Sequence, residues 1–250
     1  MKKHLSVFLL SARYALWPAL IAGALGAAAA YFALSRAAAA SGFSSELFDS
    51  AGIVVNAGAV VLGVLLMIPL RERGGVQPGY TLRRLRVSEL AAFLWQALAG
   101  AMAYFIFLMC VAAVCLFYGL HLQSQGLGEA GDMSVLVAMI VSPTAHALLP
   151  LGDWPVYIRM AAVLYTLGAA AAYSGFVSRR GRLAVSPFIL LALCWIGMGL
   201  EAHVGEYPYE LLATVVCGVA LLIMIISVRS HQQDEALPLS EPYGDGLGQG

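Results

Sequence analysis

Long runs without charge constrain this sequence more than any other feature. Six of them reach or approach the roughly 20 residues that a helix needs to cross a bilayer. They are Tyr14–Leu34, Ala51–Leu70, Leu90–Leu120, Met160–Val177, Leu183–Leu200 and Leu211–Val228. Backbone polar groups in lipid must bond within their own segment, so these runs predict helices. We therefore predict an all-α integral membrane protein, with a transmembrane domain at residues 1–229 and a flexible cytoplasmic tail at residues 230–250.

A seventh uncharged stretch, Met133–Gly152, decides how many times the chain crosses. Lysine and arginine concentrate on the cytoplasmic side of membrane proteins. With a cytoplasmic N-terminus, six spans place 12 of the 14 basic residues inside and leave Arg36 and Arg159 outside, whereas seven spans give 9 inside and 5 outside. We therefore predict six transmembrane helices in the cell (inner or plasma) membrane, with both termini cytoplasmic. Met133–Gly152 then becomes a re-entrant or outer-surface helical segment, broken near Pro143.

The loop between the second and third spans carries a strongly basic segment. It reads TLRRLRVS from Thr81 to Ser88, with leucine and valine interleaved among arginines. Ser88 is placed to cap the third helix, and Glu89 suits the positive end of that helix. The segment is either an anchor whose arginines meet lipid phosphates or a docking element for a cytoplasmic partner.

The order of these elements resembles the membrane subunit of a type-two ABC exporter, an ABC transporter permease. The likeness is carried by an amphipathic N-terminal helix (MKKHLSVFLLSARYALW), two spans, the loop TLRRLRVSELAAFL, and a later tight basic loop, YSGFVSRRGRLAVSPFIL. Members of that family have six spans, an interfacial N-terminal helix and a cytoplasmic element between spans two and three.

The resemblance implies that two such subunits, the same or related, pair across a pathway and that a separate ATPase subunit docks beneath each. ATP and Mg²⁺ would bind the ATPase, and this chain would bind no cofactor or metal and catalyse no reaction. An amphipathic or hydrophobic compound, such as an antimicrobial peptide, a drug or a lipid-like molecule, would move outward. The ATPase-docking residues would be Thr81, Leu82, Arg83, Arg84, Leu85, Arg86, Ser88, Arg179, Arg180 and Arg182.

Two side-chain amides, Asn56 and Gln96, fall within predicted spans. A polar group at this depth usually faces protein or a pathway. Each amide either lines a translocation pathway or makes an interhelical hydrogen bond worth ~0.6 kcal/mol.

Other classes of function find less support in the residues. A phosphate-binding loop needs a Gly-Lys dipeptide, which does not occur, and the histidines lack the spacing of a zinc motif. A non-transporting assembly or sensor subunit stays open. So does a secondary transporter driven by protons or ions, although that class usually carries ionisable residues in its spans and the six predicted spans contain none. We expect membrane lipid as a partner and no nucleic acid.

Overall fold

The computed structural model describes residues 2–41, 43–70, 87–125, 134–150, 152–178 and 207–236, and these ranges contain helices and no strand. The helices are α1 (Lys2–Ser41), α2 (Glu46–Asp49), α3 (Gly52–Leu70), α5 (Glu89–Ser124), α6 (Val135–Val141), α7 (Pro143–Leu148), α8 (Trp154–Ser178) and α10 (Tyr207–Ala236). Within this part of the chain, five helical stretches are long and apolar enough to cross a membrane. For these residues the prediction of a helical fold suited to a membrane is confirmed.

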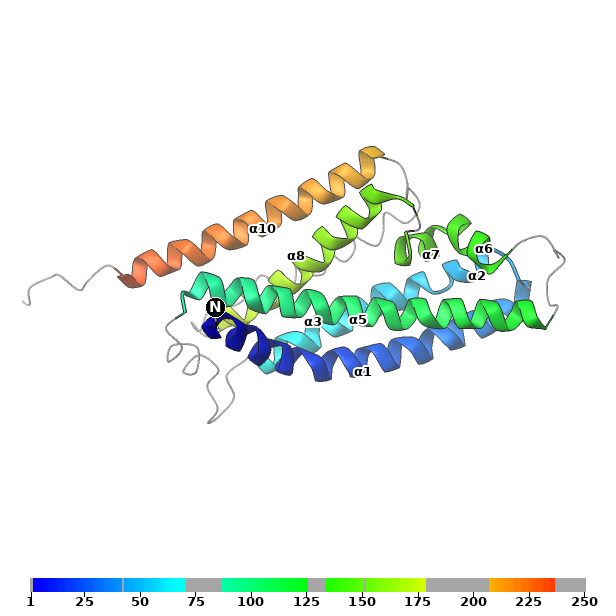
Figure 1. The fold of residues 1–250 in the computed structure, drawn as a ribbon, viewed down its shortest axis with the longest axis horizontal. Coiled ribbons are helices and arrows are strands. Elements are labelled where there is room, and N and C mark those ends of the chain that lie inside the picture. Colours follow the sequence, from blue (N-terminus) through cyan, green and yellow to red (C-terminus); the bar gives the residue numbers. More distant parts are fainter. Residues whose placement is uncertain are drawn as a thin grey trace, which may run out of the picture.

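Helix α1 joins two elements that the sequence presented separately. The amphipathic N-terminus and the run Tyr14–Leu34 form one helix of 40 residues, about 60 Å long at 1.5 Å per residue. This length is about twice the hydrocarbon thickness of a bilayer. Pro18 lies inside the helix and has no N–H to donate to the preceding turn. Figure 1 shows α1 changing direction in its N-terminal part.

The other long helices, α3, α5, α8 and α10, match predicted spans but differ from them at their ends. Helix α8 begins at Trp154 rather than Met160, and α10 begins at Tyr207 rather than Leu211. Helix α10 also continues to Ala236, beyond the predicted start of the tail at residue 230. The predicted span Leu183–Leu200 lies outside the described residues.

Helices α1 and α5 run parallel and side by side (Figure 1). Near their N-termini the rings of Phe8 and Trp95 pack with centroids 5.6 Å apart. Further along both helices Tyr31 meets Tyr118 edge to face at 5.3 Å. Because the contacts advance in the same direction on both helices, α1 and α5 share one orientation.

Helix α3 runs antiparallel to this pair. Ala59 of α3 accepts a hydrogen bond from the hydroxyl of Tyr104 at 3.3 Å. The Phe107 ring fills the notch left by two glycines, so a Cβ at Gly26 or Gly58 would overlap it. The two glycines thus allow α1 and α3 to pack closely around the Phe107 ring of α5.

Helices α6 and α7 lie at the end of the bundle where α5 finishes. Helix α6 lies against that end, because a Cβ on Gly119 would come 2.8 Å from Val135. The break between α6 and α7 falls at Ser142, directly before Pro143, close to the predicted position. Figure 1 shows α6 and α7 beside α2, away from the N-terminus of α5.

Helices α8 and α10 are parallel neighbours held by three polar contacts in register. Arg159 meets Glu210, Thr166 donates to the carbonyl of Cys217 at 3.4 Å, and the hydroxyls of Tyr173 and Ser227 lie 2.8 Å apart. Both helices therefore run in the same direction along the bundle.

One end of the bundle gathers the starts of α1 and α5 and the finishes of α3 and α8. Tyr14, Leu66, Gln96 and Ala172 line one small cavity there, which places these four helix regions at the same level. We call this the basic end, since the chain enters residues 71–86 after Leu70 and the arginines 179, 180 and 182 directly after Ser178. The opposite end, which holds α6 and α7, is called the α7 end.

Candidate functional site

Polar side chains collect at the α7 end, and α7 itself is fastened by one of them. Ser142 ends α6 in an extended conformation (φ −71°, ψ 121°), and its Oγ accepts from the amide of Ala145, which caps α7. The same hydroxyl donates to Asp49 Oδ1 at 2.6 Å, and the Thr144 amide donates to that oxygen at 3.4 Å. A carboxylate at the N-terminus of a helix is stabilised by the exposed amides. Asp49 therefore binds α7 to the end of α2, directly before α3.

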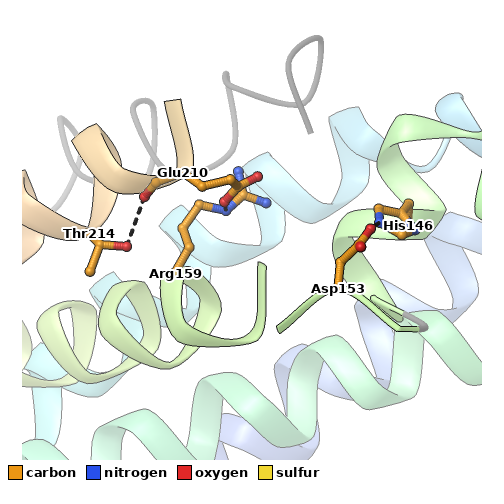
Figure 2. A network of polar contacts seen from close by, with 5 residues as sticks. All are labelled: His146, Asp153, Arg159, Glu210 and Thr214. Carbon is orange, nitrogen blue, oxygen red and sulfur yellow. Dashed lines mark hydrogen bonds and ion pairs between the residues drawn. The ribbon is translucent and has the colours of Figure 1, made fainter. Parts of the chain in front are cut away.

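The other end of α7 is joined to α8. His146 Nε2 lies 2.8 Å from Asp153 Oδ2, at the residue preceding α8, as Figure 2 shows. The imidazole is buried, whereas about half of the Asp153 side chain is exposed. Nδ1 of His146 is buried and makes no hydrogen bond among the described residues. This contact sets the angle of the turn from α7 into α8.

The most deeply buried charges belong to Arg159 of α8 and Glu210 of α10. Arg159 Nε lies 2.8 Å from Glu210 Oε2, and the two side chains are 2% and 3% exposed. Figure 2 shows the two side chains meeting between the helices, with Thr214 donating to the Glu210 carbonyl at 2.8 Å. Burial of each charge alone carries a desolvation penalty of several kcal/mol, and the attraction between the two charges offsets part of this penalty.

This pair corrects the predicted helix starts. The charge-free spans were predicted to begin at Met160 and Leu211 and therefore did not include Arg159 and Glu210. The structure places both in the first two turns of their helices and buries them together. A signal for this was present: Pro155 and Pro208 each lie in the first turn of a helix, where proline is tolerated because its missing N–H has no partner within the helix. Reading them as helix starts would have included both charges.

The α7 end contains two pairs of ionisable side chains, His146–Asp153 and Arg159–Glu210, and the capped helix α7. Within the described ranges, no three histidine, cysteine, aspartate or glutamate side chains come together as they would around a metal ion. The arrangement suits a conformational role, because one carboxylate joins α7 to α2, one His–Asp contact joins α7 to the start of α8, and one ion pair joins α8 to α10.

Most of the predicted docking residues lie outside the described residues: Thr81, Leu82, Arg83, Arg84, Leu85, Arg86, Arg179, Arg180 and Arg182. Ser88 is described, and it caps α5 as predicted by accepting from the Ala91 amide at 3.3 Å. The side chain of Ser88 is exposed. Its docking role stays a prediction.

The two predicted pathway amides lie in different surroundings. Asn56 Nδ2 donates to the carbonyl of Gly52 one turn earlier at 3.0 Å, so its amide is bonded within its own helix rather than across helices. Gln96 lies on α5 at the cavity of the basic end. The structure thus does not bring the two amides to one site.

Comparison with models of known protein families, with curated proteins and with solved structures gave no match.

Proposed function

We propose that this chain is the membrane-spanning subunit of an ATP-driven exporter of the type-two ABC class. In this proposal two permease subunits pair, a separate ATPase docks at the basic end, and an amphipathic or hydrophobic compound moves outward. The support comes from the order of sequence elements and from the way the described helices pack.

The observation that carries the proposal is the convergence of helix ends at the basic end. The chain leaves α3 at Leu70 and enters α5 at Glu89 there, and it leaves α8 at Ser178 at the same end. Both basic segments, 81–88 and 179–182, are therefore attached to one end of the bundle. A single cytoplasmic ATPase could contact both, whereas a topology that separated them would leave no joint docking surface.

The N-terminal turns of α1 also meet α5 at this end. Val7 and Ala92 are buried together, Phe8 packs on Trp95, and Trp95 Nε1 lies 3.4 Å from His4 Nδ1. A force applied to the segment before Ser88 would act on this joint, because α5 begins immediately afterwards and continues as one helix of 36 residues.

Helix α5 can pass such a movement to α8 through their closest approach. A Cβ on Gly100 would lie 2.8 Å from the Gly168 Cα, so the two backbones pack directly against each other. From α8 the three polar contacts continue to α10. ATP-driven closure at the basic end could in this way shift helices whose other ends form the α7 end.

The helix directions also support six spans. Helices α1 and α5 share one direction, α3 is opposite, and α8 and α10 are parallel. The proposal places a sixth span, Leu183–Leu200, between the parallel helices α8 and α10; these residues lie outside the described ranges. The α6–α7 segment starts and finishes at the α7 end, which suits a re-entrant or outer-surface element.

The proposal is tested by co-expression with the ATPase from the neighbouring reading frame. Replacement of Arg83, Arg84 and Leu85 by alanine should reduce co-purification of the ATPase at least tenfold, while the amount of inserted permease stays unchanged. A matched control replaces Arg36, at the other end of α1, and should leave pairing intact. Unchanged pairing in the triple variant, or neighbouring frames without an ATPase, would contradict the proposal and favour a non-transporting assembly or sensor subunit.

The buried Arg159–Glu210 pair favours a second candidate, a transporter driven by protons or ions. Ionisable side chains inside membrane helices often mark proton or ion pathways. The two functions separate in proteoliposomes: transport by the exporter requires ATP and the ATPase, whereas coupled transport persists without ATP and collapses with the ion gradient.

A further inference from the structure

A cavity at the basic end lies between four helices, α1, α3, α5 and α8. Its volume is about 30 Å³, room for about two water-sized groups. Small residues make the space: Ala99 and Gly100 on one side, Gly168 and Ala171 on the other. Their backbones are already in contact at the glycines, so the cavity results from the absence of larger side chains beside that contact.

Three polar side chains face this space from two helices: Ser11 and Tyr14 of α1 and Gln96 of α5. Ser11 donates to the carbonyl of Val7 at 2.9 Å and keeps its oxygen available as an acceptor. Among the described residues, the amide of Gln96 and the hydroxyl of Tyr14 form no hydrogen bond with the protein. Gln96 is half-buried and Tyr14 is 37% exposed, so both groups are accessible to a polar group that enters the cavity and can form hydrogen bonds with it.

Among the described residues, none that lines the cavity is charged. An ion placed there would lose its hydration without gaining a counter-charge. The chemistry therefore selects a neutral group that both donates and accepts hydrogen bonds, such as an amide or hydroxyl.

The cavity also has an apolar exit. Tyr14 at its rim is 37% exposed, and Trp17 and Ile21, on the same face of α1, are 70% and 48% exposed. The spacing i, i+3, i+7 places these three side chains along one stripe. A hydrocarbon chain attached to a group in the cavity could lie along this stripe.

We propose that this cavity binds the neutral polar group of an amphipathic molecule whose apolar part lies along Tyr14, Trp17 and Ile21. The inference rests on the proposed export function and specifies a substrate contact for it: Gln96 supplies the main hydrogen bonds, and Ala99 and Ala171 leave the space.

The test uses the full chain in nanodiscs and a medium-chain fatty amide that carries a diazirine, with cross-links mapped by mass spectrometry. Labelling should concentrate on peptides around Tyr14 and Gln96. Gln96→Leu, which removes the amide at nearly constant size, and Ala99→Val, which fills the cavity, should each weaken labelling about tenfold, the effect of losing one good hydrogen bond or the space for it. Gln123→Leu, on the exposed far end of α5, is the matched control and should change nothing.

A fatty acid or a quaternary ammonium compound of equal chain length should compete poorly. Labelling spread over the bundle, or unaffected by Gln96→Leu and Ala99→Val, would overturn the inference and leave water as the occupant. Co-purification of the ATPase is measured on the same variants and should be unchanged. If the wild type pairs with the ATPase but the cavity does not label, the inference fails alone; if the cavity labels without any ATPase pairing, the export proposal fails instead.

Discussion

Removal of one member of the Arg159–Glu210 pair should destabilise the fold more than removal of both. Glu210→Leu leaves a buried guanidinium without its carboxylate, and Arg159→Met leaves a buried carboxylate without its guanidinium. The double variant replaces both charges with apolar side chains. Because the two side chains are nearly inaccessible to solvent, the single variants cannot recover hydration without opening the α8–α10 contact.

The magnitude follows from the geometry. At 2.8 Å the Coulomb attraction is about 6 kcal/mol for an effective dielectric constant of about 20. Desolvation of both groups offsets much of this attraction, so the intact pair contributes little net stability, whereas an unpaired buried charge costs about 3–5 kcal/mol. The double variant should therefore lie within ~1–2 kcal/mol of wild type.

Thermal unfolding of purified protein in detergent, followed by retention of the monodisperse peak, gives the comparison. Each single variant should lower the transition by roughly 6–20 °C, at about 2–4 °C per kcal/mol for a chain of this size. The double variant should recover most of the loss, and the exchange Arg159→Glu/Glu210→Arg should recover part of it. If the two single effects simply add in the double variant, the side chains are not coupled and the contact between α8 and α10 has been misread.

Two further predictions concern helix packing and capping. Gly168→Ala should destabilise the bundle by about 1–3 kcal/mol, because a Cβ there would overlap the Ala97 carbonyl oxygen and the Ala101 amide nitrogen. Gly218→Ala, where a Cβ would meet no described residue within 4 Å, should be tolerated. Equal thermal stability of the two variants would refute the close α5–α8 contact. Ser142→Ala should destabilise α7 by about 1 kcal/mol, which would be seen as faster amide hydrogen exchange at Ala145 and its neighbours. Ser124→Ala, which loses only a local bond to the His121 carbonyl, should leave the amides of α7 protected. Unchanged exchange at Ala145 in Ser142→Ala would rule out that cap.

Sequence reasoning located the long helices among the described residues because apolar runs of membrane length favour helices in lipid. It failed at the starts of α8 and α10, since hydropathy treats a single arginine or glutamate as a stop signal. The two charges are tolerated because they bury each other, and that partnership joins residues far apart in sequence through the parallel packing of α8 on α10. Nothing in a single sequence indicates which helices are neighbours.

The same limit applies to the glycines and the amides. That Gly26 and Gly58 both receive the ring of Phe107 depends on the arrangement of three helices, which the sequence does not show. Gln96 was recognised as a polar residue in a span, yet its position at a cavity depends on small residues from α8. The break before Pro143 was predictable because proline at the first position of a helix marks a restart.

The central claim is that the two basic segments share one face of the membrane. It is tested most directly by single cysteines at Arg83, Arg180 and Gln125, introduced after replacement of the four native cysteines and labelled with an impermeant maleimide from each side of sealed vesicles. The account predicts that positions 83 and 180 react only from the cytoplasmic side and position 125, at the α7 end of α5, only from the outer side. Reaction of positions 83 and 180 from opposite sides would contradict it.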